Sequence, residues 1–279
     1  MNYCNWNGKI VQEGTPIISA DNRGLRYGDG LFETIKIMNG RLVMSDEHFA
    51  RLWNGMQRLQ FDIPKHFSPD VLEEQVIALA KKNGHAGAAR VRLCIIRGDG
   101  GLYDAKNHFP HYIIQTWALP EGNGEWNSNG LVAGIYADAT KSCDAISNVK
   151  HNNYLPYVLA ALHAKKEKWN DAILLNSQHT VCDSTIANVF MLKEEIIYTP
   201  ALSQGCVAGV MRHALIQFLK KSGSQIVEKA ITVDELLLAE EVFFTNSMYN
   251  IRWVKQINES TYSNSLTQKI YSNFVPTIS

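Results

Sequence analysis

Apolar residues recur every three or four positions in four stretches of the chain. This spacing gathers them on one face of a helix, so each stretch predicts an amphipathic helix. The four stripes are Phe49-Leu52-Trp53-Met56, Leu72-Val76-Leu79-Ala80, Leu155-Val158-Leu159-Leu162 and Met211-Ala214-Leu215-Phe218-Leu219. Ser45 is expected to cap the first helix and Ser68-Pro69 to start the second. Thr232-Val-Asp-Glu235 predicts a capping box at the start of a further short helix.

Shorter apolar runs between the helices predict strands. Asn7-Gly8 and Asn39-Gly40 are turn pairs that predict hairpins, and residues 23–30 are predicted to form a glycine-punctuated loop. The predicted strands cover residues 31–37, 41–44, 90–96, 112–117, 131–137, 172–175, 187–192, 196–198 and 241–245. Strands and helices alternate in both halves, which indicates a mixed α/β chain.

Residues 119–130 are rich in glycine, proline and asparagine and poor in apolar groups, as interdomain linkers are. We therefore expect a smaller N-terminal α/β domain at 1–118 and a larger C-terminal domain at 131–279. A chain of 279 residues is long enough for two domains of medium size.

The charge balance argues against a nucleic-acid or membrane partner. Lys+Arg and Asp+Glu both number 27, so the chain has no excess of positive charge, and no apolar run reaches membrane-spanning length. The five cysteines are scattered and show no CxxC spacing, so we expect neither a disulfide framework nor a metal site. Free thiols suit a reducing cytoplasm, where we expect the protein to act.

Four polar features could together build an active site. Lys150 lies among polar residues shortly before the helix expected around Pro156, an unfavourable place for a plain ammonium because a helix N-terminus is positive. Asp183 leads into a strand, Gly205–Gly209 opens a helix whose N–H groups could bind an anion, and Thr245-Asn246-Ser247 offers further donors. A lysine amine, an acid and an anion cradle suit a pyridoxal phosphate enzyme. Spacing alone leaves open a surface lysine in an α/β enzyme of other chemistry.

The chain resembles the class IV aminotransferase family of fold-type IV pyridoxal phosphate enzymes. This family contains branched-chain aminotransferases, D-amino-acid aminotransferases and 4-amino-4-deoxychorismate lyases. The markers of the resemblance are Arg23…Tyr27-Gly-Asp-Gly-Leu-Phe-Glu-Thr34, Glu47-His-Phe-Ala-Arg51-Leu52, Lys150-His-Asn-Asn153, Asn188-Val-Phe190, Tyr198-Thr-Pro200 and Gly209-Val-Met-Arg212. In this order and at this spacing they are highly specific as a set. They imply a two-domain α+β fold similar to that of D-amino-acid aminotransferase.

The resemblance implies pyridoxal 5′-phosphate as the cofactor and assigns the residues that hold it. Lys150 would form the Schiff base and then remove the proton from the substrate Cα. Asp183 stands where the family usually has the glutamate that keeps the pyridine nitrogen protonated. Further cofactor contacts are implied for Arg51, Asn188, Val210, Met211, Ser247, Met248 and Tyr154. Most of these would bind the phosphate, and Tyr154 would reach the phenolic oxygen.

The reaction is suggested by a narrower likeness. Residues 245–254, Lys150-His151 and the glycines of 98–101 look most like the lyase branch, in which 4-amino-4-deoxychorismate loses pyruvate and yields 4-aminobenzoate for folate biosynthesis. Leu102 departs from that pattern, which often has an arginine there. The residue that binds the substrate carboxylate is left open among Arg26, Arg92, Arg97, Lys106 and His108.

Two alternatives to the lyase remain on the sequence. One is an aminotransferase that acts on branched-chain or D-amino acids, because the same lysine and carboxylate would serve both reactions. The other is a non-catalytic dimeric scaffold of the same fold. In each case the family resemblance implies a homodimer, and for the two enzymes a small amine or amino acid as the substrate.

Overall fold

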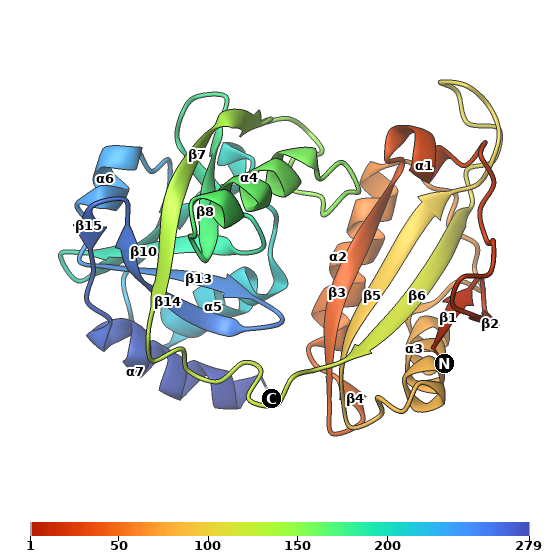
Figure 1. Ribbon diagram of the computed structural model, residues 1–279, viewed down its shortest axis with the longest axis horizontal. Helices are drawn as coiled ribbons and strands as arrows, with labels where there is room; N and C mark the ends of the chain where they lie inside the picture. Colours follow the sequence, from red (N-terminus) through yellow and green to blue (C-terminus); the bar gives the residue numbers. More distant parts are fainter. Residues whose placement is uncertain (1, 279) are drawn as a thin grey trace. The chain divides into compact units, whose positions relative to one another are not determined.

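The computed structural model describes residues 2–278, which form two compact units (Figure 1). The first contains the chain up to Asn123 together with Val149–Asn153, and the second contains Gly124–Asn148 and the chain from Tyr154 onward. The chain therefore returns to the first unit for five residues. That return carries Lys150, which the sequence had assigned to a C-terminal domain beginning at residue 131.

The first unit is built on one antiparallel sheet with the strand order β2-β1-β6-β5-β3-β4. Its strands are β1 (Tyr3–Trp6), β2 (Lys9–Gln12), β3 (Gly30–Met38), β4 (Arg41–Leu42), β5 (Ala88–Arg97) and β6 (Pro110–Ala118). The two predicted hairpin turns are present, because Asn7-Gly8 and Asn39-Gly40 all have positive φ, as a type I′ turn requires. In the long β3–β5 ladder Phe32 faces Cys94 and Thr34 faces Arg92.

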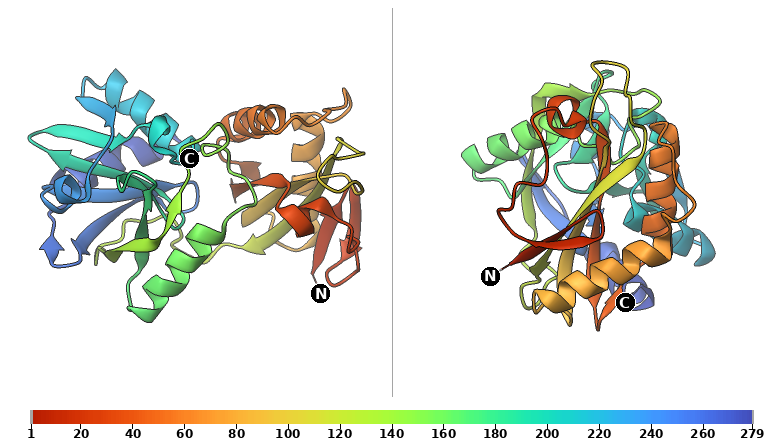
Figure 2. Two further views of the ribbon diagram at one scale, coloured as in Figure 1. Left: turned by 90° about the horizontal axis from the view of Figure 1, so that it is seen from above. Right: turned by 90° about the vertical axis from the view of Figure 1, so that its right-hand side faces the viewer.

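Two helices, α2 (Ser45–Arg58) and α3 (Pro69–Lys82), cover one face of this sheet (Figure 2). Their predicted stripes are confirmed, since Phe49, Leu52 and Met56 and the buried residues of α3 share one core with the sheet. Two local expectations were wrong. Ser45 is the first residue of α2 rather than its cap, and residues 23–30 are not all loop, because Asn22 caps a short helix, α1 (Arg23–Tyr27).

The second unit is built on a mixed nine-stranded sheet with the order β12-β11-β10-β13-β14-β7-β8-β9 and β15 beside β14. Its strands are β7 (Leu131–Lys141), β8 (Asp171–Asn176), β9 (Val181–Ser184), β10 (Asn188–Lys193), β11 (Ile196–Pro200), β12 (Ile226–Lys229), β13 (Glu241–Asn246), β14 (Asn250–Ile257) and β15 (Ser260–Thr261). Strand β9 also pairs with β10, through Asp183 and Asn188, which closes six of the strands into a barrel. The predicted site residues Asp183 and Asn188 thus form the closing bridge.

The helices of the second unit pack on this barrel. They are α4 (Leu155–Lys166), α5 (Val210–Lys221), α6 (Val233–Leu237) and α7 (Ser265–Phe274), with short 3₁₀ turns η1 (Leu202–Gln204) and η2 (Val275–Thr277). The predicted capping box at Thr232 and Glu235 is confirmed. None of the helices within residues 2–278 is long and apolar enough to cross a membrane.

Helix α4 is present as predicted but presents a different face to the core. Its buried side chains are Tyr157, Ala160 and Ala164, which pack with β7 and β8. The expected stripe of Leu155, Val158, Leu159 and Leu162 is exposed instead. Because the helix is apolar on both faces, the stripe alone could not tell which one the core would take.

Candidate active site

Lys150 is held in the first unit by pairing with β3. Its carbonyl oxygen accepts a hydrogen bond from the Phe32 N–H at 2.9 Å, and the Asn152 N–H donates to the Gly30 carbonyl at 2.9 Å. Val149 on the preceding position is buried in the core of this unit. The segment therefore forms an isolated antiparallel bridge to β3, between His151 and Leu31, and its position is fixed by β3 rather than by the start of α4, five residues further on.

A second cation lies against the same aromatic ring as Lys150. The Lys150 Nζ is 4.5 Å from the centre of the Phe32 ring, and the Arg92 guanidinium is 3.8 Å from the same centre. A ring face attracts a cation, so Phe32 holds both charges near it. Within residues 2–278 no carboxylate forms an ion pair with Arg92. This guanidinium is therefore suited to an anionic group of a ligand.

Arg51 is fixed by a buried carboxylate in the same unit. Glu33 accepts from the Arg51 Nε at 2.8 Å and Nη2 at 2.5 Å, and from the His48 Nδ1 at 2.7 Å. Burial alone would raise the pKa of Glu33, but Arg51 and His48 outweigh it and lower that pKa to about 2. The two-point contact holds the guanidinium plane in one orientation, as a phosphate-binding arginine needs.

The other carboxylate-binding candidates of the first unit have different surroundings. Arg97 is buried and donates to the Asp29 carboxylate, to two backbone carbonyls and toward His108, so its donors are committed to the fold. Arg26 pairs with Asp21 at the surface. Lys106 and His108 are exposed in the loop between β5 and β6. Among the five candidates, only Arg92 lies against the ring that also holds Lys150.

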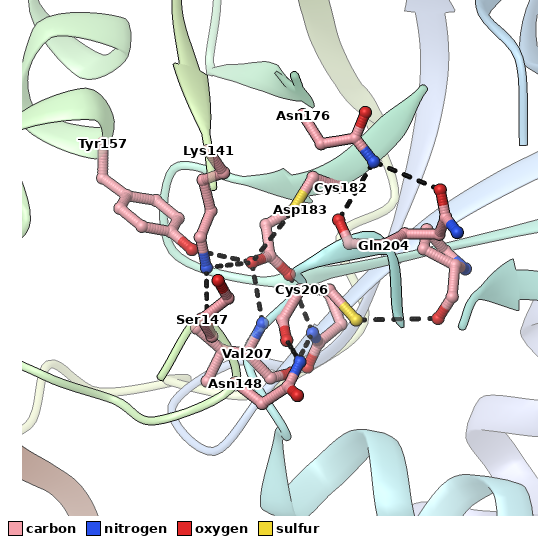
Figure 3. Close-up of polar contacts among 12 residues, drawn as sticks. Lys141, Ser147, Asn148, Tyr157, Asn176, Cys182, Asp183, Gln204, Cys206 and Val207 are labelled. Carbon is pink, nitrogen blue, oxygen red and sulfur yellow. Dashed lines mark hydrogen bonds and ion pairs between the residues drawn. The ribbon is translucent and has the colours of Figure 1, made fainter. Parts of the chain in front are cut away.

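Asp183 is the centre of a buried polar cluster in the second unit (Figure 3). Its Oδ2 accepts from the Tyr157 hydroxyl at 2.7 Å and the Val207 N–H at 2.9 Å, and the Lys141 Nζ lies 3.6 Å away. The Asn188 Nδ2 donates to Oδ1 at 2.8 Å. All four neighbours are donors, which matches the acceptor-only character of an ionised carboxylate.

The titratable neighbours of Asp183 stay protonated. Burial and then the charge of Asp183 raise the pKa of Tyr157 well above its usual value. The same two causes raise the pKa of Cys206 to about 12 and that of Cys182 well above the usual thiol range. Neither thiol is therefore a nucleophile at neutral pH. Tyr154, the N-cap residue of α4, stacks on the Tyr157 ring at 4.1 Å.

The N-terminus of α5 is shaped for an anion. Its N-cap is Gly209, so the helix has no side-chain cap, and the N–H groups of Val210 and Met211 lie in its first turn. A Cβ at Gly209 would come within 1.9 Å of the Asn188 Oδ1, so only glycine allows this close approach. These features fit the phosphate of a cofactor. The Met211 side chain is buried.

The turn after β13 contains the last two predicted site residues, Ser247 and Met248. The Met248 and Tyr249 N–H groups both donate to the Asn246 Oδ1, at 2.9 and 2.8 Å. This turn is thereby fixed by the side chain of Asn246.

The predicted site residues thus fall into two sets, each assembled within one unit.

Several residues of these two sets were not found from the sequence. Glu33 lies on a strand that is otherwise mostly apolar, and a charge there was a signal of a buried ion pair. Nothing in the sequence marked Lys141 or Tyr157. They precede Asp183 by 42 and 26 positions and contact it only in the folded chain. Within residues 2–278 no cluster of metal-ligating side chains is present.

Comparisons with known proteins agree on one family. A family model described as amino-transferase class IV matches residues 30–257. An aminodeoxychorismate lyase of Vibrio harveyi is 29% identical over 255 residues, covering 91% of each chain. A D-alanine aminotransferase of Bacillus licheniformis is 29% identical over 269 residues, covering 92% of this chain and 88% of the relative. The branched-chain aminotransferase of Thermoproteus uzoniensis, solved with norvaline, has a similar fold, with a TM-score of 0.89 at 22% identity over 99% of this chain and 94% of that one.

Proposed function

Because the chain belongs to the class IV aminotransferase family, we propose that it is a 4-amino-4-deoxychorismate lyase, which releases pyruvate and yields 4-aminobenzoate. The family is one of pyridoxal phosphate enzymes, and the chain is such an enzyme with the fold-type IV architecture. The observation that carries the choice of reaction is the pair of cations, Lys150 and Arg92, at the Phe32 ring. 4-Amino-4-deoxychorismate has two carboxylates, whereas a branched-chain amino acid has one and an apolar side chain. An arginine beside the reacting lysine suits the more anionic substrate.

Seven further residues are proposed as contacts of the cofactor, in addition to Lys150 and Asn188. Arg51, held by Glu33, and the first N–H groups of α5 at Val210 and Met211 would bind the phosphate. Asp183 would face the pyridine nitrogen, with Asn188 holding one of its oxygens. Ser247 and Met248, in the turn after β13, and Tyr154, at the start of α4, are proposed as further contacts with the phosphate and the phenolic oxygen.

Proton movement in this proposal falls to two residues. Bound pyridoxal phosphate supplies an electron sink for the charge that develops at the substrate Cα. Lys150 removes the proton from that carbon, and Asp183 holds a proton at the ring nitrogen. In a lyase the substrate would then lose pyruvate, whereas in an aminotransferase Lys150 would pass the proton on and a keto acid would be released. The residues are the same, so the substrate contacts decide between the outcomes.

Arg92 is proposed to bind a substrate carboxylate. Replacing it by glutamine is expected to raise KM for 4-amino-4-deoxychorismate about 10- to 100-fold with a smaller change in kcat, since a hydrogen-bonded charge is lost from the bound substrate. Steady-state kinetics measure this. Arg90→Gln is the matched control, because Arg90 is on the same strand and lies over Trp117 instead. An unchanged KM for Arg92→Gln would remove Arg92 from the substrate site.

The second candidate function is an aminotransferase for branched-chain or D-amino acids. The similarity to a D-alanine aminotransferase and the fold of a branched-chain aminotransferase support it. The deciding assay offers the purified enzyme 4-amino-4-deoxychorismate and, in parallel, L- and D-amino acids with a 2-oxo acid acceptor. Pyruvate and 4-aminobenzoate in the first reaction support the lyase. Keto-acid formation alone supports the aminotransferase, and no product in either contradicts both.

We also propose that the enzyme is a cytoplasmic homodimer. All five cysteines are free thiols, which suits a reducing compartment. The exposed apolar side chains of α4, Leu155, Val158, Leu159 and Leu162, form a surface that a second copy could cover. Light scattering on wild type is expected to give twice the chain mass, and Leu159→Glu with Leu162→Glu is expected to shift it toward the monomer. A monomeric wild type would contradict the proposal.

A further inference from the structure

Lys141 is a buried cation that the proposed reaction does not use. It is the last residue of β7, and its side chain is 5% exposed. Its Nζ lies 3.6 Å from the Asp183 Oδ2 and donates to the Ser147 carbonyl at 3.0 Å (Figure 3). Among the ion pairs of residues 2–278, this is the one that Asp183 makes. A lysine is costly to bury, so a partner that needs its charge is the simplest reason for its position.

Asp183 needs such a charge. Its side chain is 3% exposed, so an ionised carboxylate there has lost its water shell. The groups that face it are Tyr157 from α4, Asn188 from β10, the Val207 N–H, and the thiols of Cys182 and Cys206. All of these are neutral. Lys141 is therefore the charge that compensates the carboxylate before any ligand is bound.

Lys141 also connects Asp183 to the segment that precedes Lys150. The Ser147 carbonyl accepts from its Nζ, and the neighbouring Asn148 donates to the carbonyls of Leu202 and Cys206. The Ala208 N–H in turn donates to the Asn148 carbonyl. One lysine thus contacts both the carboxylate and the loop that joins β7 to the Lys150 segment. Moving its head group would disturb both.

We propose that Lys141 is a positioning residue that holds the Asp183 carboxylate in place, so that Asp183 can serve the pyridine nitrogen of the cofactor. The proposal rests on the proposed function for the identity of the group that Asp183 meets. Lys141 acts through Asp183 and does not itself touch the cofactor. Its loss would leave the buried carboxylate without an opposite charge beside it, and the carboxylate would be held less firmly opposite the ring nitrogen.

The test is a double-mutant cycle on cofactor binding. Cofactor-free wild type, Lys141→Met, Asp183→Asn and the double variant are titrated with pyridoxal phosphate, and the dissociation constant is read from visible absorbance. Lys141→Met and Asp183→Asn are each expected to weaken binding about 10-fold or more, and the double variant is expected to be no weaker than Asp183→Asn. Lys141→Arg, which keeps the charge, should bind within about threefold of wild type.

The matched control is Lys229→Met. Lys229 pairs with Glu235 at 2.6 Å in the same unit, but both side chains are one-third exposed, and among the ion pairs of residues 2–278 neither residue is paired with Asp183. Cofactor binding by this variant should equal that of wild type. Equal binding by Lys141→Met and wild type, or effects of Lys141→Met and Asp183→Asn that multiply in the double variant, would overturn the proposal.

The thermal midpoints of the same four cofactor-free proteins separate this proposal from the proposed function. If the effects of Lys141→Met and Asp183→Asn are coupled in the thermal midpoint but not in the dissociation constant for the cofactor, the pair has a structural role only. That result would overturn the positioning role. If Lys141→Met does not fold, the double variant, which has neither charge, should fold, and its failure to do so would also count against the pairing. A wild type that gives no visible band with pyridoxal phosphate would instead contradict the proposed function, while the stability cycle would still test the pair.

Discussion

Replacing Lys150 by alanine is expected to lower turnover by at least about 10⁴-fold on any substrate that wild type accepts, because in the proposed mechanism the same amine holds the cofactor and moves the proton at Cα. The effect should fall on kcat. The visible band of the covalently held cofactor should be lost as well. Assays at saturating pyridoxal phosphate separate lost chemistry from lost binding, since the proposed phosphate contacts do not include the Lys150 side chain.

Lys81→Ala is the matched control for this experiment. Lys81 is an exposed lysine in the last turn of α3, in the same unit, and its loss should leave the spectrum and the rate unchanged. The Lys150 segment is held to β3 by its backbone, so the alanine variant should keep its fold. A Lys150→Ala enzyme that turns over substrate would remove Lys150 from the mechanism.

Local features of the fold were predictable because their causes are local. The turn at Asn7-Gly8 needs two residues that tolerate positive φ, and the sequence supplies them. The capping box of α6 needs only Thr232 and Glu235, three positions apart. Features of this kind depend on a few neighbouring residues, so a short stretch of sequence is enough to predict them.

The face that α4 buries depends on distant residues instead. The Tyr157 side chain points inward, where its hydroxyl donates a hydrogen bond to Asp183 on β9. Leucines at 155, 159 and 162 are left outside although their spacing alone favoured burial. A period of 3.6 residues predicts that a helix has an apolar face. When a helix has apolar residues on two opposite faces, as α4 does, the period does not tell which face is buried.

The site follows the same division. The motif around Lys150 carried the family resemblance, so the lysine itself could be found from the sequence. Its setting could not, because backbone pairing with β3 brings it to Phe32 and Arg92, both of which come more than 50 positions earlier in the chain. The ion pair of Lys141 and Asp183 also depends on the pairing of β8 with both β7 and β9. Such contacts become visible only once the topology is known.

Replacing Glu33 by glutamine is expected to lower the free energy of unfolding by about 3 kcal/mol near neutral pH. The pKa of Glu33 is lowered from 4.5 to about 2 in the folded protein, and about 2.5 pKa units correspond to about 3 kcal/mol. The residue is 1% exposed, so solvent screens its interaction with Arg51 and His48 little. Urea unfolding of the two proteins at pH 7 measures the difference.

The pH dependence of that difference identifies its cause. A depressed pKa in the folded state gives stability that is fully present above the unfolded value, near pH 4.5, and is lost as the pH falls toward about 2. The gap between wild type and Glu33→Gln should therefore be constant above about pH 5 and shrink below it. Glu47→Gln, which removes an exposed carboxylate from α2, should show no such gap at any pH. A gap for Glu33→Gln that stayed constant down to pH 3 would mean that packing, and not the charge held between Arg51 and His48, is what the glutamate contributes.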